Sequence, residues 1–395
     1  MSKIKMSKKR EQSLRKLAKL MNSRHQLPFP ITKPLLDCFD LVITPEEVDF
    51  LTRMGKETHT YEQAASLNSL SEESFRPFFE AQLKKGLVWS QAGSDGKDRF
   101  SLPGIMVGWF ETYLSDGSET PEKEEFARRL DNLFKSWSRM NFFPFRGLLN
   151  YRFKRRLKPH QRIVAIRQPD EAKKTKKITI DRTIKVPETK VYPSKSVYEL
   201  IDKHGDGNDI AVMHCFCRQW HKMVDEPCRF NFSSEACIVI GVFTRHVVDY
   251  GIGRYISKDN ALELIQDLHA KGAVHQVFHE REDVSQPEIA ICNCCWDCCG
   301  VLGSYNRGIL PLYFKCYYQA QISDQSLCTG CGICEEYCPV QAISVKEEKS
   351  YVNPEKCIGC GQCELQCPED VITVVPNERE VMLPLQKRSE ARITW

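Results

Sequence analysis

Apolar residues recur at helical spacing through the first third of the chain, and a helix-start signal precedes each run. The pattern predicts four helices, which begin after the N-cap residues Thr44, Thr60, Ser71 and Thr120. Between the third and fourth helices, two short apolar runs flank a turn at residues 94–96 and predict a β-hairpin. The first third of the chain is therefore expected to form a mainly helical unit.

The order of elements over residues 40–115, three helices and then a hairpin, resembles that of the winged-helix family. The resemblance implies a third helix that enters the major groove of DNA. The exposed positions of that helix include Glu72, Glu73 and Glu80, which DNA phosphates would repel. A protein-interaction or scaffolding role is therefore preferred to DNA binding, and nucleic acid is not expected among the partners.

The pattern becomes mixed in the middle of the chain. A helix is expected from Ser257 to Gly272, followed by a strand over residues 273–277. Residues 178–186 alternate between apolar and polar types, which is typical of short strands or of an extended linker. The middle of the chain is therefore expected to be an α/β domain.

Charge is small in total, at +4, but unevenly distributed. The first 25 residues are basic and lack the apolar core of a signal peptide, and their thin leucine stripe favours a solvated, frayed helix. Between Tyr151 and Lys195 there are fifteen Lys or Arg residues and four acids, which favours a solvated connector. A docking surface for an acidic electron donor is the first alternative, and nucleic-acid binding is the second, weakened because few aromatic residues are interleaved. No run of eighteen apolar residues is present, so no transmembrane segment is expected and a cytoplasmic location is favoured.

Nineteen cysteines, in a chain without a secretory signal, change this picture because they indicate metal binding rather than disulfides. Two matching runs near the C-terminus each have the spacing C-x2-C-x2-C-x3-C-P. They resemble the ligand runs of bacterial-type two-cluster ferredoxins over residues 320–376, and the resemblance implies two [4Fe–4S] clusters and single-electron transfer. It also implies that the fourth cysteine of each run ligates the other cluster. The implied ligands are Cys328, Cys331, Cys334 and Cys367 for the first cluster, and Cys357, Cys360, Cys363 and Cys338 for the second.

A zinc site is the alternative for these two runs. It is disfavoured because zinc sites usually take thiolates from two separated C-x2-C pairs, whereas here three lie in one tight run, twice.

The middle of the chain holds a second concentration of cysteines, with five of them in eight residues. Packing does not explain this density, so one or two further iron–sulfur clusters are expected there. Zinc in this domain and a redox dithiol at Cys295-x-x-Cys298 remain alternatives. The candidate ligands are Cys215, Cys217, Cys228, Cys237, Cys292, Cys294, Cys295, Cys298 and Cys299.

Several charged or titratable residues accompany these cysteines. His214 and Arg218 flank the first pair, and hydrogen bonding or ion pairing to the ligands is preferred to contact with a substrate. His275 and His279 are expected to be structural residues on a strand.

The expected fold class is α+β multidomain, with a winged-helix-like N-terminal domain, a cysteine-rich α/β middle domain and a C-terminal ferredoxin-like dicluster domain. The composite resembles multidomain iron–sulfur proteins of anaerobes. The expected segments are a basic N-terminal extension (1–39), a winged-helix-like and helical domain (40–150), a basic linker (151–195), a cysteine-rich domain (196–319), a ferredoxin domain (320–376) and a tail (377–395).

The function expected is iron–sulfur electron transfer, in which the ferredoxin module relays single electrons to or from a middle-domain cluster and a redox partner protein. The chain has no G-x-G-x-x-G after a strand and no phosphate-binding P-loop, so no flavin or nicotinamide site is expected. Two alternatives remain open. One is an oxidoreductase whose middle-domain cluster is the active site, and the other is a redox-responsive winged-helix regulator.

Overall fold

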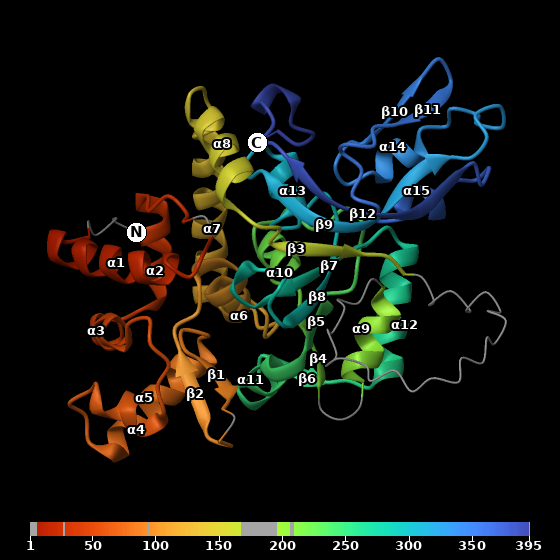
Figure 1. Ribbon diagram of the computed structural model, residues 1–395. Coiled ribbons are helices and arrows are strands. Elements are labelled where there is room, and N and C mark those ends of the chain that lie inside the picture. The colour runs from red at the N-terminus through yellow and green to blue at the C-terminus, as the bar shows by residue number, and fades with distance from the viewer. Residues whose placement is uncertain (1–5, 27, 94, 167–195, 206–208, 395) are drawn as a thin grey trace, which may run out of the picture.

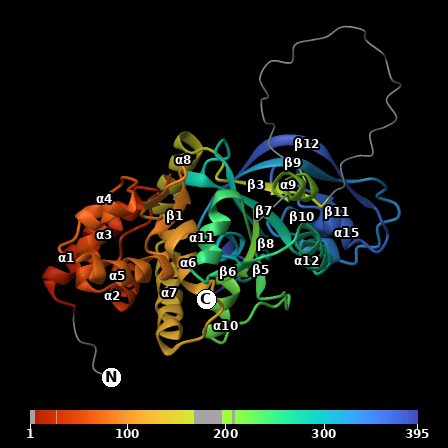
Figure 2. The ribbon, with the colours of Figure 1, turned by 90° about the horizontal axis from the view of Figure 1, so that it is seen from below.

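The computed structural model describes residues 6–26, 28–93, 95–166, 196–205 and 209–394. The elements form three regions in a row, namely N-terminal helices, a central mixed sheet and a smaller C-terminal region (Figures 1 and 2). None of the helices in these ranges is long and apolar enough to span a membrane.

The N-terminal region contains the four predicted helices and the predicted hairpin. The side-chain oxygen of each predicted N-cap, Thr44, Thr60, Ser71 and Thr120, accepts a hydrogen bond from a backbone N–H three residues on. The elements are α1 (Lys8–Asn22), α2 (Lys33–Val42), α3 (Pro45–Met54), α4 (Tyr61–Ser66), α5 (Glu72–Lys84), β1 (Trp89–Ala92), β2 (Asp98–Ser101), α6 (Phe110–Leu114), α7 (Pro121–Arg139) and α8 (Phe145–Arg156).

Helix α1 is not the frayed, solvated helix that its basic composition favours. Leu14, Leu17, Ala18 and Met21 have no exposed surface and belong to the same apolar core as α2 and α3. These residues have the i, i+3, i+4, i+7 spacing of one helix face, so α1 buries a full stripe while its lysines stay outside. Helices α1 and α2 are therefore packed into the N-terminal core rather than extending from it.

The central region is an eight-stranded sheet with the strand order β12-β9-β3-β7-β8-β5-β4-β6. Strands β3 and β9 run parallel, and all the other neighbours run antiparallel. The strands are β3 (Gln161–Val164), β4 (Ile210–His214), β5 (Glu235–Ile240), β6 (Gly253–Tyr255), β7 (Val274–His279), β8 (Glu288–Cys294), β9 (Leu312–Ile322) and β12 (Ile372–Leu383).

The two faces of this sheet are covered differently. One face carries Val164, Ile238 and Val277 into an apolar core with α9 and α12. The other face carries Met213, Cys237 and other side chains towards α10, α11 and the N-terminal region. The helices are α9 (Val197–His204), α10 (Phe216–Met223), α11 (Thr244–Asp249), α12 (Lys258–Ala270) and α13 (Leu302–Asn306).

For residues 161–164, strand β3 contradicts the prediction of a solvated connector, which covers residues 151–195. It lies inside the sheet between β7 and β9, and Arg162 has no exposed surface. Its guanidinium is paired with the Glu288 carboxylate at 2.6 Å, which offsets the cost of burying the charge. The strands predicted over 178–186 lie outside the described residues.

The C-terminal region is joined to the sheet through the long antiparallel pair β9 and β12. Strand β12 continues past residue 376, so the predicted boundary between the ferredoxin domain and the tail falls inside a strand. The other elements of this region are α14 (Ile333–Tyr337), β10 (Ile343–Lys346), β11 (Lys349–Val352) and α15 (Gln362–Leu365).

The N-terminal and central regions share an interface. The β1–β2 hairpin packs against the central region, where the Trp89 ring lies 4.3 Å from that of Phe243. Arg245 pairs with Asp98 of the same hairpin at 3.0 Å. This interface closes one side of the cysteine-bearing face of the sheet.

Candidate functional site

The C-terminal region encloses two hollows, each lined by four cysteines. The volumes are about 270 Å³ and 330 Å³. Each hollow is surrounded by three cysteines of one run and the fourth cysteine of the other, which is the division that the ferredoxin resemblance implies. The outer hollow is lined by Cys328, Cys331, Cys334 and Cys367, and the inner hollow by Cys338, Cys357, Cys360 and Cys363.

Local backbone geometry places these thiols. Gly332 and Gly361 have φ values of 81° and 85° and immediately precede the short helices α14 and α15, which carry the third cysteine of each run. Gly359 also has a positive φ, and a Cβ atom there would collide with the carbonyl group of Tyr318 in β9. The second run is thus packed directly against the central sheet.

Hydrogen-bond donors point at several of the sulfur atoms. The Ala342 N–H donates to Cys338 Sγ at 3.1 Å, and the Ala320 N–H of β9 donates to Cys357 Sγ at 3.4 Å. In the outer hollow, Ser350 Oγ lies 3.2 Å from Cys334 Sγ and 3.5 Å from Cys328 Sγ. Four thiols around one hollow, with donors to sulfur, fit a [4Fe–4S] cluster in each.

The two hollows differ in their exposure to solvent, and both border the central sheet. Cys331 of the outer hollow is exposed, and so are Glu335 and Glu336 nearby. The inner hollow is lined by Ala320 of β9. Burial raises the pKa of Cys316, also on β9, and the thiols of the inner hollow raise it further. The outer hollow also borders the sheet, through Ile372 at the start of β12, so each hollow lies against one strand of the β9–β12 pair.

The nine candidate cysteines of the middle region divide into three groups. In the first, Cys295 Sγ lies 3.6 Å from Cys228 Sγ and 3.3 Å from Cys298 Sγ. Hydrogen bonds from Cys295 and Cys298 lower the pKa of the Cys228 thiol. This group is called the thiol triad below.

The second group consists of Cys215, Cys217, Cys294 and Cys299. Cys217 interacts with both Cys215 and Cys299. Cys294 interacts with Cys292, which links this group to the third one, and with Cys299. This group, called the thiol quartet below, joins the start of α10 to the end of β8 and the loop that follows it.

Donors also point at the thiol quartet. The Gly300 N–H donates to Cys217 Sγ at 3.0 Å, and the Val301 N–H donates to Cys299 Sγ at 3.3 Å. The side-chain amide of Gln276 donates to Cys299 Sγ at 3.8 Å. Four buried or half-buried thiols with such donors fit an iron–sulfur cluster, as the two hollows do.

The third group is the pair Cys237 and Cys292, whose sulfur atoms are 3.9 Å apart. The two residues are direct partners across the neighbouring strands β5 and β8. Their side chains extend the sulfur-rich face of the sheet.

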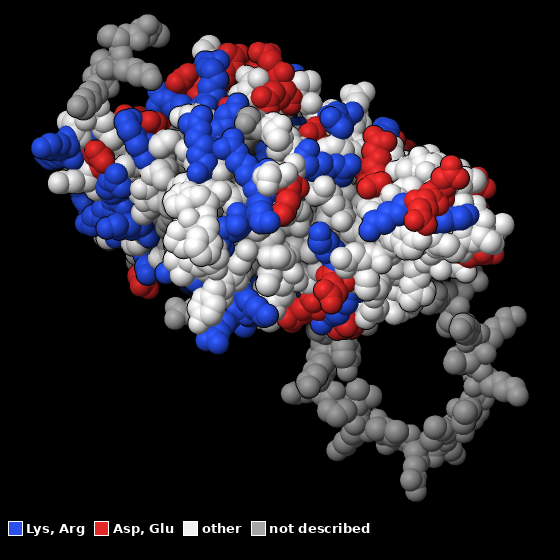
Figure 3. Space-filling model, turned by 90° about the horizontal axis from the view of Figure 1, so that it is seen from above, with Lys and Arg blue, Asp and Glu red and all other residues white. Residues whose placement is uncertain are grey.

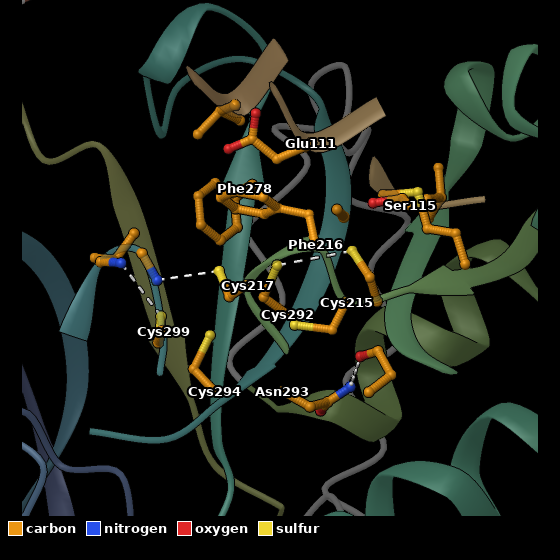
Figure 4. A pocket seen from close by; sticks show the side chains of 18 of the residues that line it. Glu111, Ser115, Cys215, Phe216, Cys217, Phe278, Cys292, Asn293, Cys294 and Cys299 are labelled. Atoms are coloured by element: carbon orange, nitrogen blue, oxygen red, sulfur yellow. Dashed lines mark hydrogen bonds between the residues drawn. The ribbon is translucent and has the colours of Figure 1, made fainter. Parts of the chain in front are cut away.

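An apolar cavity separates this face from the N-terminal region. Trp89, Met106 and Glu111 belong to its N-terminal wall, and Figure 4 shows five of the cysteines on its other side. Glu111 accepts a hydrogen bond from the Gly108 N–H at 2.8 Å, and burial raises the pKa of its carboxyl group. The lining cysteines are Cys215, Cys217, Cys237, Cys292, Cys294, Cys295, Cys298 and Cys299.

Arg218 supplies positive charge between the thiol triad and the thiol quartet. Burial alone would lower its pKa, but the Cys215 thiol and the three thiols of the triad raise it. The guanidinium donates to the carbonyl oxygens of Ser233 and Asn293 at 2.8 Å and 2.6 Å. A fixed cation at this position offsets the negative charge that thiolates bring into a buried site.

The histidines on β7 make hydrogen bonds within the protein. His275 Nδ1 lies 2.7 Å from the Asn293 side-chain oxygen, and burial lowers its pKa to about 3. His279 Nδ1 lies 2.7 Å from the Gln286 carbonyl oxygen, and Arg162 donates to its other ring nitrogen at 2.8 Å. These contacts fix the two rings within the sheet.

Sequence reasoning missed Glu111, Gln276 and Ser350. None of them lies in a cysteine run, and each reaches its site from an element distant in sequence. A half-buried acid that follows a kinked segment is a signal that only the fold reveals; Val107 in that segment has a φ of 48°.

Residues 327–380 match the family model described as a 4Fe-4S dicluster domain. No curated protein matches the chain. The C-terminal region is therefore a ferredoxin-type domain that binds [4Fe–4S] clusters and supports an iron–sulfur electron-transfer role. The thiol groups of the middle region are compatible with that role.

Proposed function

We propose that the chain is an electron-transfer protein whose C-terminal domain relays single electrons between a redox partner and a further iron–sulfur cluster held by the thiol quartet. When bound, each [4Fe–4S] cluster carries one electron at a time. The outer hollow, the inner hollow and the thiol quartet are the proposed binding sites, in that order from the surface inwards.

The observation that carries this proposal is the continuity between the inner hollow and the thiol quartet. Helix α13 follows Cys299, and its Asn306 side chain donates to the Pro339 carbonyl oxygen, next to Cys338, at 2.9 Å. Cys299, Tyr305 and Cys338 belong to one buried cluster of side chains. Packed side chains therefore connect the thiol quartet to the inner hollow, which suits electron transfer over a short distance.

The test compares Cys217→Ala, which removes a quartet thiol, with Cys38→Ala, which removes a lone buried thiol in α2. The proposal predicts that Cys217→Ala loses about four irons per chain, the content of one cubane, and keeps about eight. Cys38→Ala keeps the full iron content. Unchanged iron in Cys217→Ala contradicts the proposal.

A second candidate function, an oxidoreductase, is favoured by the apolar cavity beside the thiol quartet. Its apolar walls suit a small organic substrate, and the raised pKa of Glu111 suits a proton donor. The discriminating measurement is reoxidation of the reduced protein by small electron-accepting compounds. An enzyme shows saturable turnover that Glu111→Gln slows, whereas a carrier shows neither saturation nor dependence on Glu111.

For the N-terminal region we propose a winged-helix-like scaffold rather than the DNA-reading part of a redox-responsive regulator. The hairpin that would serve as the wing is packed on the central region through Trp89, Ser90 and Asp98. A gel shift with random duplex DNA at low salt tests this, because the scaffold predicts no retarded band.

We further propose a reducing compartment such as the cytoplasm. All nineteen cysteines are free of disulfide bonds, and metal-binding thiolates require a reducing environment.

A further inference from the structure

The thiol triad has a spacing that differs from those of the other cysteine groups. Its three sulfur atoms all lie within 4.8 Å of one another. The described residues include all nineteen cysteines. Among these residues, the thiol triad is the one group of three or more potential metal ligands whose ligand atoms lie within this distance. The eight cysteines of the ferredoxin-type domain form no such group.

Ligand spacing distinguishes one metal ion from a cluster. Thiolates on a single tetrahedral zinc ion lie at about 2.3 Å from it, which places their sulfur atoms roughly 3.8 Å apart. Thiolates on a cubane each bind a different iron and are spread more widely. The separations of 3.3 Å and 3.6 Å within the thiol triad match one ion.

The surroundings of the thiol triad also resemble those of a metal–thiolate site. The Cys298 N–H donates to Cys295 Sγ at 3.3 Å within a C-x2-C turn. Cys295 and Cys298 are buried, at 1% and 2% exposure, and Arg218 offsets their charge. A cluster of buried thiolates without an ion would carry negative charges in close contact, which is costly.

We propose that Cys228, Cys295 and Cys298 hold one Zn²⁺ ion, separate from the iron–sulfur clusters. Three protein thiolates leave the fourth coordination position for water or another small ligand. The proposal rests on the spacing of the triad and does not depend on the proposed electron relay.

The ion would join two segments beside the ferredoxin-type domain, the loop at Cys228 and the C-x2-C turn of Cys295 and Cys298. Phe230, two residues after Cys228, packs against Trp296 at 5.6 Å and Tyr337 at 5.9 Å. The Arg392 guanidinium lies 3.6 Å from the centre of the Trp296 ring. Zinc at the triad would therefore stabilise the contact between the central region and the domain that carries the two hollows.

The experiment is metal analysis of the full-length protein, purified anaerobically from cells grown with iron and zinc. The wild type is expected to contain about one zinc per chain, and zinc X-ray absorption is expected to show sulfur neighbours at about 2.3 Å. Cys228→Ala is expected to lose that zinc and keep all of its iron. Cys38→Ala is the matched control and is expected to keep both metals.

Two results overturn the proposal. One is a wild type without zinc, and the other is a Cys228→Ala variant that loses about four irons, which would place a further cubane at the triad. If Cys228→Ala does not fold, the zinc content and X-ray absorption of the wild type decide alone. Failure of the electron-relay proposal is recognised separately, because its sign is an unchanged iron content in Cys217→Ala, whatever the zinc content.

Discussion

Single side chains set the environment of the sulfur atoms, and Ser350 is the clearest case. Its hydroxyl group lies within hydrogen-bond distance of two thiols of the outer hollow, 3.2 Å and 3.5 Å away. A hydrogen bond to a cluster ligand stabilises the more negative, reduced state. Ser350 is therefore expected to raise the reduction potential at the outer hollow.

Ser350→Ala is predicted to make the more exposed of the two ferredoxin clusters harder to reduce, by up to about 60 mV for a contribution of about 1.4 kcal/mol. The measurement is a redox titration followed by electron paramagnetic resonance. Ser326→Ala, which removes an exposed hydroxyl group that donates to Asp324, is the control and should leave the potential unchanged. An unshifted potential in Ser350→Ala would show that this hydroxyl group does not tune the site.

The sequence could predict the cysteines at this scale but not their partners. The ferredoxin runs have a spacing that only a few kinds of site use, so the division of their eight cysteines into two sets of four could be stated in advance. Each of the two hollows is lined by one of these sets. Within the middle region, the division into a triad, a quartet and a pair depends on which strands are neighbours. Cys228 and Cys295 meet across 67 residues, and no local pattern contains that information.

Among the elements, the buried ion pairs around Glu288 connect β3, β8 and α9. Glu288 binds Arg162 at 2.6 Å and Lys203 at 2.7 Å. Burial raises its pKa, but hydrogen bonds from His204 and Lys203 and the charge of Arg162 outweigh burial and hold the pKa well below its usual range. These contacts explain how a strand from a basic segment is accommodated inside the sheet.

Glu288→Gln is predicted to lower the free energy of unfolding by about 3 kcal/mol at neutral pH, because it removes the carboxylate charge that lies 2.6 Å from the buried Arg162 guanidinium. The folded pKa is depressed, so the stabilisation is present above the unfolded pKa of about 4.3 and is lost as the pH falls below it. Urea unfolding of both proteins at several pH values measures this. A difference between them that stays constant down to pH 4 would contradict the account.

At the scale of elements, the sequence predicts the helices that begin with an N-cap residue, but it does not predict strand β3. The caps at Thr44, Thr60, Ser71 and Thr120 are local, so they are visible in a short window of sequence. Strand β3 lies in a strongly basic stretch that suggests solvent, and its counter-charge comes from Glu288, 126 residues away. Helix α1 was misjudged for a similar reason, because its lysines obscured a complete apolar face.

At the scale of the whole molecule, charge separates the two ends. Figure 3 shows Lys and Arg side chains gathered over the part of one face nearer the N-terminal helices, with both signs mixed at the opposite end. Exposed Glu335 and Glu336 lie beside Cys331, the exposed cysteine of the outer hollow. These two carboxylates would therefore attract a redox partner whose docking surface is positively charged.

Replacing both acids, Glu335→Gln with Glu336→Gln, is predicted to slow electron transfer to a basic acceptor such as cytochrome c several-fold at low ionic strength. The difference should disappear at high salt, where exposed charges are screened. The matched control is Glu73→Gln with Glu80→Gln on α5, which lies at the other end of the molecule. Equal rates for the two double variants would place the docking surface elsewhere.

The central claim is that the middle region holds a cluster in addition to the two of the ferredoxin-type domain. Iron and acid-labile sulfide per chain, measured on anaerobically purified protein alongside electron paramagnetic resonance of the reduced sample, test it most directly. The account predicts about 12 irons per chain and a signal beyond that of the coupled ferredoxin pair. About 8 irons, with the ferredoxin signal alone, would contradict it.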